Sequence, residues 1–381
     1  MDIGSVDITD DTLSRLSWGS PDGVLCPKLE RLDWRIDVSY TLLPFFHLFL
    51  SPHLKHINLF TLPDRGMAPQ QGLSCIEKII LHLPSSLEDI SLMCGPWNRE
   101  PLKDAISSLL LRYGPSLRSF GSNTPLSEEA FNHLVRLPNL RSWVAFSKPP
   151  RTLPKTAFPS LEQLHLESGA LPWLHLLTTP GNGKLQNGLG PAAVTPNTKI
   201  GETLKFLHCH GNTPVDPTLL SSILLFRNLV LLYVDGCHCR IGSGCTFPLT
   251  DDDVENLAAA LPSLASLELG RVCGFNSCHT TISSLWSLSV HCPSLTILEV
   301  HFNTNNIVGD IRRLLGDDSR HEKTRCKLRH LSVGLLPLQV WEEDVGIVGM
   351  GFVDIFPCLD SFWGCSMNLG GWIAVESKLR D

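Results

Sequence analysis

The sequence predicts an α/β fold in which short parallel strands alternate with helices. Three observations lead to this prediction: one short phrase recurs along the 381 residues, stretches of helical periodicity lie between its copies, and proline often marks the boundary between the two. A strand of three or four residues cannot fold alone, so the copies must stack side by side. We therefore expect residues 1–381 to form a single solenoid of about twelve units.

The clearest copy of the phrase is L-A-S-L-E-L at 264–269. Leu267 and Leu269 are two residues apart, so both point to the same face of an extended strand. Leu264 belongs to the turn that leads into this strand, and Pro262 ends the preceding helix. The phrase thus predicts a turn followed by a short strand with one buried face.

Twelve copies fit this description. Their first apolar positions are mostly 21 to 35 residues apart, with one gap of 43, which leaves room for one loop and one helix in each unit. The copies are Leu29/Leu32/Trp34, Leu54/Ile57/Leu59, Leu87/Ile90/Leu92, Leu117/Phe120, Leu140/Trp143, Leu161/Leu164/Leu166, Leu204/Leu207/Cys209, Leu229/Leu232/Val234, Leu264/Leu267/Leu269, Leu295/Leu298/Val300, Leu328/Leu331/Val333 and Leu359/Phe362.

Helices are expected between the strands, because apolar residues there recur at the helical period and polar caps precede them. A short capped helix is expected over Ile8–Leu16. Longer ones are expected over Gly72–Leu83, Pro101–Tyr113, Leu126–Leu137, Thr250–Leu261, Thr281–His291 and Ile307–Leu315. The acidic run Asp251–Asp253 is interpreted as the charged start of one of these helices.

Residues 178–201 interrupt the pattern. They are rich in Gly, Pro, Asn and Thr and contain few large apolar residues. This composition predicts a flexible insertion between the sixth and seventh strands. A tolerated surface loop is the favoured interpretation, and a regulatory or partner-binding loop is the alternative.

Composition narrows the function classes. The net charge is −7 and the sequence pI about 6.1, so there is no basic excess for nucleic-acid binding. The longest apolar stretch, Leu42–Leu50, is too short to span a bilayer, and the first residues lack the features of a signal peptide. The thirteen cysteines are therefore expected to be reduced thiols, in the cytoplasm or nucleus.

Metal binding and catalysis are the chemical alternatives. The candidate metal ligands, which follow strands of successive copies and could converge on zinc, are Cys237, Cys239, Cys273, Cys278 and His279, with His208, Cys209 and His210 nearby. They lack a paired C-x-x-C signature, and small thiols are common in protein cores. We therefore expect no metal and no cofactor. The sequence also has no G-x-S-x-G elbow, no Walker A motif and no G-x-G-x-x-G after a strand, so we expect no enzyme.

The residues between the buried strand positions point to the other face of the sheet. Aromatic, histidine and acidic side chains recur there, which is typical of a protein-binding surface. The candidate partner-binding residues are Phe60, Phe146, His165, His208, Tyr233, Glu268, Glu299, His301 and Trp363. The alternative is that most of these side chains simply face solvent.

The recurring phrase resembles the leucine-rich repeat, L-x-x-L-x-L-x-x-N/C, whose last polar position is matched by Asn212, Cys237 and Asn303. The resemblance implies an irregular curved parallel sheet on an open concave face and helices on the convex face. The stretches F-P-S-L-E-Q-L-H-L, C-P-S-L-T-I-L-E-V and C-P-K-L-E-R-L-D-W, with L-T-D-D-D-V-E-N-L-A-A-A-L-P, look like the leucine-rich region of fungal F-box proteins.

This second resemblance covers the repeats only. Proteins of that family carry an N-terminal F-box that docks on the Skp adaptor of a cullin ubiquitin ligase, and no L-P-x-E-[IL] opening precedes the first copy here. The resemblance implies a non-catalytic scaffold, the substrate-recognition region of an F-box-type ubiquitin ligase subunit. Its partners would be a protein on the concave face and, if an F-box lies upstream, the Skp adaptor. A stand-alone leucine-rich-repeat interaction protein unconnected with ubiquitin is the alternative.

Overall fold

The structure is a computed structural model of the chain. It describes residues 10–19, 23–36, 40–61, 69–94, 100–146, 153–154, 156–167, 170–178, 199–210, 215–235, 246–270, 277–316, 326–333, 342–364, 375 and 377. The chain divides into two compact units, Met1–Glu162 and Gln163–Asp381. The expectation of a single array over residues 1–381 stays a prediction.

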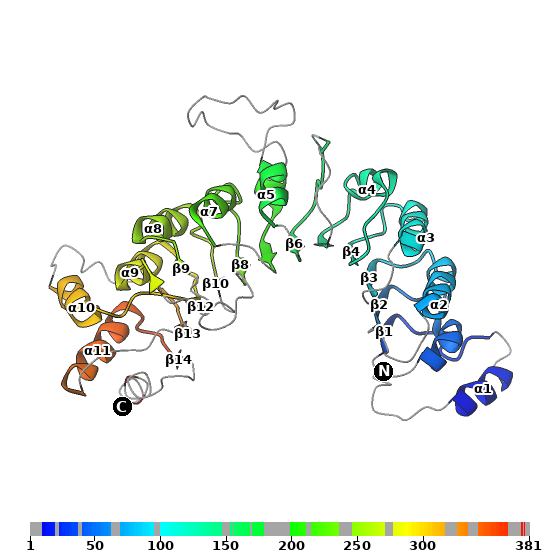
Figure 1. The fold of residues 1–381 in the computed structure, drawn as a ribbon, viewed down its shortest axis with the longest axis horizontal. Coiled ribbons are helices and arrows are strands. Elements are labelled where there is room, and N and C mark those ends of the chain that lie inside the picture. Colours follow the sequence, from blue (N-terminus) through cyan, green and yellow to red (C-terminus); the bar gives the residue numbers. More distant parts are fainter. Residues whose placement is uncertain are drawn as a thin grey trace. The chain divides into compact units, whose positions relative to one another are not determined.

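In the described residues of the unit Met1–Glu162, helices alternate with five parallel strands that pair in sequence order. Figure 1 shows its helices along one side of the strands. Its elements are α1 (Asp10–Gly19), β1 (Arg31–Ile36), the 3-10 helix η1 (Tyr40–Phe49), β2 (His56–Thr61), α2 (Pro69–His82), β3 (Asp89–Cys94), α3 (Glu100–Arg112), β4 (Ser119–Ser122), α4 (Glu128–Leu134) and β5 (Ser142–Ala145).

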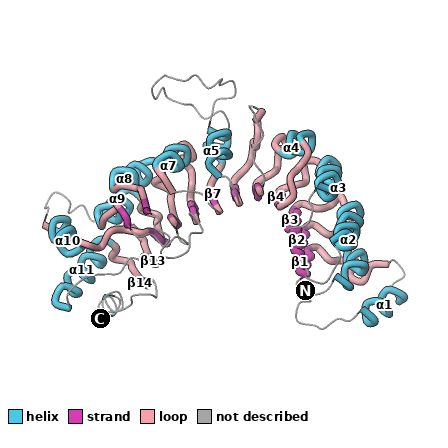
Figure 2. Tube along the Cα trace, in the orientation of Figure 1, coloured by secondary structure: helices cyan, strands magenta, loops and turns pink. Residues whose placement is uncertain are grey.

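The part of the unit Gln163–Asp381 that the structure describes repeats this arrangement with seven parallel strands, β6 to β8, β10 and β12 to β14. Figure 2 shows the same alternation of magenta strands and cyan helices. Its elements are β6 (Gln163–Leu166), α5 (Ala170–Thr178), α6 (Ile200–Thr203), β7 (Phe206–Cys209), α7 (Pro217–Ile223), β8 (Leu231–Val234), β9 (Thr246–Phe247), α8 (Asp251–Ala260), β10 (Ser266–Leu269), β11 (Ser277–Cys278), α9 (Ile282–His291), β12 (Ile297–Val300), α10 (Ile307–Leu315), β13 (His330–Val333), the 3-10 helix η3 (Glu342–Asp344), α11 (Val345–Ile355) and β14 (Ser361–Gly364).

The predicted α/β fold of alternating parallel strands and helices is confirmed. Each of the twelve copies of the phrase supplies one of these strands, and the helices expected between them form with ends shifted by a few residues. The two-residue strands β9 and β11, which pair with each other, were not predicted. The assignment to the leucine-rich repeats stays a prediction. Most of the expected insertion lies outside the described residues, which resume at Lys199 after Thr178.

Buried leucines hold neighbouring strands together. Leu264, Leu267 and Leu269 are fully buried, and Leu267 lies in register between Leu232 on β8 and Leu298 on β12. Burial of one such side chain contributes about 1.5–3 kcal/mol. Within each unit the strands place a large apolar residue at this same register position, so the phrase stabilises the fold only when its copies stack.

The turns before many of the strands are fixed by backbone hydrogen bonds as well. The N–H of Ala265 donates to the Val230 carbonyl oxygen at 2.7 Å, and the N–H of Thr296 donates to the Ala265 carbonyl oxygen at 2.8 Å. The same pattern occurs in the first unit, where Glu88 donates to Lys55 at 2.7 Å. Adjacent strands are therefore locked in one register before the first strand residue.

The helices begin where the sequence places capping residues. Thr250 and Asp253 form a capping box at the start of α8, in which the Thr250 side chain accepts from the Asp253 N–H and the Asp253 carboxylate accepts from the Thr250 N–H. Ser127 caps α4 by a single side-chain hydrogen bond, which its hydroxyl oxygen accepts from the Ala130 N–H. Among the described helices, none is long and apolar enough to cross a membrane.

Candidate functional site

A row of side chains crosses the unit Gln163–Asp381 at one register position. Each member is the residue between two buried positions of its strand, and each lies beside the next across the ladder. The row consists of His165, His208, Tyr233, Glu268, Glu299, Ser332 and Trp363. All but Trp363 are half-buried, whereas Trp363 is 68% exposed.

The alternation of the strand backbone puts this row on the face away from the leucines. In β7, Leu207 and Cys209 are fully buried while Phe206 and His208 are half-buried. β8 has the same pattern, with Leu232 buried. The residues of the row therefore lie on the face opposite the leucines, and their role as a binding surface stays a prediction.

Four rings of this face form a cluster over β6, β7 and β8. The ring centroid of His165 lies 4.7 Å from that of Phe206 and 5.6 Å from that of His208. The Tyr233 ring stands edge-on to both Phe206, at 5.5 Å, and His208, at 6.0 Å. Edge-to-face packing adds stabilisation beyond the area buried. The four rings therefore form a contiguous aromatic cluster on this face.

The environment of His165 keeps its ring uncharged at neutral pH. Burial, with a smaller contribution from the charge that His208 can carry, lowers the pKa of His165 to about 4. A neutral imidazole offers one hydrogen-bond donor, one acceptor and a flat apolar surface. At this position the ring therefore serves as an aromatic contact rather than a cation.

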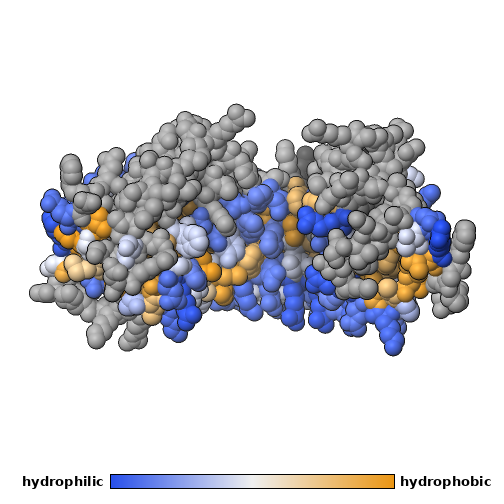
Figure 3. All heavy atoms as spheres, turned by 90° about the horizontal axis from the view of Figure 1, so that it is seen from below, coloured by the Kyte–Doolittle hydropathy of each residue, from blue (hydrophilic) through white to orange (hydrophobic). Residues whose placement is uncertain are grey.

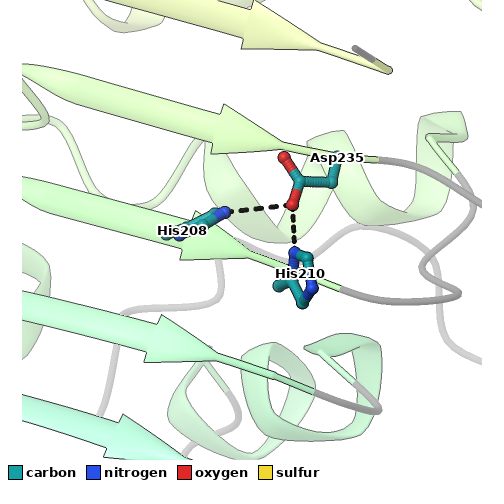
Figure 4. A group of neighbouring side chains, drawn as sticks. All are labelled: His208, His210 and Asp235. Atoms are coloured by element: carbon teal, nitrogen blue, oxygen red, sulfur yellow. Dashed lines mark hydrogen bonds and ion pairs between the residues drawn. The ribbon is translucent and has the colours of Figure 1, made fainter. Parts of the chain in front are cut away.

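A polar group of three side chains lies at the carboxyl ends of β7 and β8. His208 Nε2 lies 3.3 Å from Asp235 Oδ2, and His210 Nδ1 is hydrogen-bonded to the same oxygen. Figure 4 shows both imidazoles directed at the Asp235 carboxylate. Burial opposes ionisation of Asp235, but the hydrogen bond from His210 and the charge of His208 outweigh it and hold the pKa of this carboxyl below its usual value.

A second carboxylate approaches the same group. Glu167 follows β6, and its Oε2 lies 3.9 Å from His210 Nε2, on the ring edge away from Asp235. Backbone pairing fixes this placement, because the His210 N–H donates to the Leu166 carbonyl oxygen at 2.8 Å. His210 therefore lies between two carboxylates.

The first unit carries the other two aromatic candidates. Phe60, half-buried on β2, lies under the Arg35 guanidinium, whose central carbon is 5.2 Å from the ring centroid. In this cation–π contact the guanidinium covers part of one face of the Phe60 ring. Phe146 follows β5 and is half-buried. These residues are placed within their own unit only.

The expectation for His301 is wrong. Its side chain is 2% exposed, and its Nε2 donates to the Gly270 carbonyl oxygen at 3.1 Å. Strand alternation would place His301 beside Glu299, but β12 ends at Val300 and the chain then turns toward Thr280, whose carbonyl oxygen accepts from the Asn303 N–H at 2.7 Å. His301 is a core residue and not part of the exposed face.

The cysteine candidates for a metal site are placed only in part. Cys237, Cys239 and Cys273 lie outside the described residues. Cys278 is buried and in hydrogen-bonding contact with Thr280 Oγ1 at 2.8 Å, and burial raises the pKa of its thiol to about 11. The adjacent His279 is exposed. Cys278 thus acts as a structural thiol of the core, as buried cysteines commonly do.

Two residues of this face were not singled out from the sequence. Phe206 stands two positions before His208, and Glu167 stands two positions after His165. The alternation that identified the row would have placed both on the same face. Phe206 joins the ring cluster and Glu167 approaches His210 through contacts with neighbouring strands, and a single copy of the phrase does not reveal such contacts.

No protein-family model matches the chain, and no curated protein matches it closely enough to indicate a relationship.

Proposed function

We propose that the chain is a non-catalytic protein-binding scaffold that holds a partner on the strand face of the unit Gln163–Asp381. The observation that carries this proposal is the in-register row, with the ring cluster of His165, Phe206, His208 and Tyr233 over β6 to β8 and an exposed Trp363 on β14. Tyrosine and tryptophan are the side chains that most often dominate the binding energy of protein interfaces.

The chemistry of the row favours a protein over other ligands. Glu268 and Glu299 lie between the ring cluster and Trp363, in register with Tyr233 on one side and Ser332 on the other. Such acidic groups repel nucleic-acid phosphates, and the whole chain carries a net charge of −7. In the view of Figure 3, hydrophilic and hydrophobic residues are interspersed over the surface that is not drawn in grey. A mixed surface with aromatic anchors suits a protein partner.

The wider setting that we propose is the substrate-recognition region of an F-box-type ubiquitin ligase subunit, acting in the cytoplasm or nucleus. Its support is the resemblance of the repeats to the leucine-rich region of fungal F-box proteins. A stand-alone interaction protein of leucine-rich-repeat type, without any link to ubiquitin, is the second candidate. The coding sequence upstream of these repeats separates the two, because an F-box encoded in frame with the repeats favours the ligase subunit and its absence there favours the stand-alone protein.

The binding proposal is tested by comparing the affinity of a partner for variants of the strand face with its affinity for a variant of helix α11. Proteins captured by the full chain are purified and titrated against the wild-type chain and the variants Tyr233→Ala and Trp363→Ala. We expect each variant to weaken a face-bound partner at least about 10-fold, as loss of a dominant aromatic contact does. Met350→Ala removes a similarly exposed apolar side chain, 62% exposed, from helix α11 and should leave the affinity unchanged. Equal affinities for all four proteins would contradict the proposal.

A further inference from the structure

We propose that His208, His210 and Asp235 bind one divalent transition-metal ion, with Zn²⁺ as the preferred ion. This inference concerns a metal site and does not depend on the proposed protein-binding function.

The separations of the donor atoms fit a metal ion. One ligand atom from each residue lies within 4.8 Å of the other two. In a tetrahedral site with bonds of about 2.0–2.1 Å, neighbouring ligand atoms are about 3.4 Å apart. His208 Nε2 and Asp235 Oδ2 are 3.3 Å apart, which matches such an edge. Only small side-chain rotations would open the His210 to Asp235 contact to the same length.

The backbone holds these donors in place. His208 lies on β7 and His210 directly follows this strand, where the hydrogen bond from the His210 N–H to the Leu166 carbonyl oxygen continues the pairing, so both imidazoles lie on one face. Asp235 reaches them from the next strand, where its N–H donates at 3.0 Å to the carbonyl oxygen of Cys209, the residue between the two histidines. This hydrogen bond fixes the carboxylate beside both rings, so the site needs no chain rearrangement.

Glu167 supports the assignment. When the Nδ1 atom of His210 binds the metal, its Nε2 carries the proton and faces Glu167 Oε2, now 3.9 Å away. Metal-bound histidines commonly donate their other N–H to a carboxylate, which fixes the tautomer and the ring orientation. Glu167 would therefore be a positioning residue, and His208, His210 and Asp235 the ligands.

The donor set narrows the choice of ion. Two imidazoles and one carboxylate suit zinc and its first-row neighbours better than Ca²⁺ or Mg²⁺, which prefer oxygen ligands. Three protein ligands leave a fourth tetrahedral position for water. The four side chains are between 14% and 40% exposed, so ions reach the site from solvent.

Zinc titration of the tag-free full chain, stripped with a chelator beforehand, tests the site. We expect one equivalent of Zn²⁺, with affinity lowered at least about 10-fold by His208→Ala, His210→Ala and Asp235→Asn. The matched control is His56→Ala. His56 also contacts a carboxylate, that of Asp89, but no third potential ligand among the described residues completes that pair. The control should bind zinc as the wild type does, and circular dichroism checks that every variant is folded.

Binding of Co²⁺ in place of Zn²⁺ identifies the ligand atoms of the site in the wild-type chain. Co²⁺ should bind in competition with Zn²⁺ and give the visible absorption of a site with nitrogen and oxygen ligands. A thiolate-to-cobalt charge-transfer band would assign the ion to cysteines such as Cys237 or Cys239 and overturn the proposal. It is overturned equally by a wild-type chain that takes up no zinc, or by Asp235→Asn binding as tightly as His56→Ala.

Discussion

Asp251, in the first turn of helix α8, accepts the backbone N–H of Thr281, the residue that caps helix α9, at 2.6 Å. The same carboxylate accepts the Thr281 hydroxyl at 2.7 Å and the hydroxyl of Ser284. One side chain thus satisfies polar groups at the start of the next helix along the chain. Buried or half-buried donors of this kind are costly when they lose their partner, so the contact couples neighbouring units.

Asp251→Ala should therefore destabilise the fold by about 1.5–3 kcal/mol, the range for hydrogen bonds to a charged group. Denaturant unfolding measures the loss, and hydrogen exchange at the Thr281 amide should speed up more than exchange in α7. Asp252→Ala is the control, because this neighbour is exposed and should change stability by less than about 0.5 kcal/mol. Equal losses for the two variants would mean that the contact adds nothing beyond helix-end charge.

Leu267→Ala should cost more, about 2–5 kcal/mol, because it opens a cavity between Leu232 and Leu298. Ile297→Ala removes a side chain from the adjacent strand that is 38% exposed and should cost less than about 1 kcal/mol. The unfolding midpoints of the two variants give the comparison. A cost for Ile297→Ala as large as that for Leu267→Ala would contradict the assignment of the buried and open faces.

His301 should make the fold sensitive to acid. Burial, opposed by the hydrogen bond to Gly270, lowers the pKa of His301 from 6.5 to about 4. The unfolded chain therefore binds a proton below pH 6.5 that the folded chain refuses. Stability should be independent of this group above pH 6.5 and should fall as the pH drops from 6.5 to about 4, by a total on the order of 3 kcal/mol.

Unfolding measured between pH 7.5 and about 4 tests this dependence, with the pH range set by that pKa shift. His301→Gln keeps a hydrogen-bond donor but cannot take up a proton, so its stability should fall less steeply over the acid range. His330→Gln, at an exposed position on β13, should keep the wild-type slope. The prediction fails if His301→Gln loses stability with acid as steeply as the wild type.

The sequence predicts the features that follow from backbone geometry. The positions of the twelve strands and the side of the sheet on which Tyr233 lies come from a period of two, which the ladder preserves. Contacts between side chains that lie about 25 to 30 residues apart in the chain cannot be predicted from the period of two. From the sequence, Asp251 is only the charged start of a helix, and no pattern shows that the side chains of His210 and Asp235 meet. His301 was misplaced because alternation ends where β12 ends.

Phe158 combines deep burial with an unusual backbone conformation. It is 1% exposed, stacks on Trp143 with ring centroids 4.9 Å apart, and has a positive φ of 56°. A residue other than glycine is destabilised by roughly 1–2 kcal/mol in a left-handed backbone conformation. Loss of a buried phenylalanine side chain costs about 3–5 kcal/mol. The packing gain outweighs the strain, which is why a phenylalanine is tolerated there.

The two effects separate when Phe158 is replaced by alanine and by glycine. Both variants lose the ring, so each should be destabilised by several kcal/mol, roughly 3–5 kcal/mol for alanine. Glycine ordinarily costs about 0.5–1 kcal/mol more than alanine in regular structure, but here it relieves the positive φ. We expect Phe158→Gly to be at least as stable as Phe158→Ala in denaturant unfolding. A glycine variant clearly less stable than the alanine variant would show that no strain is stored at this position.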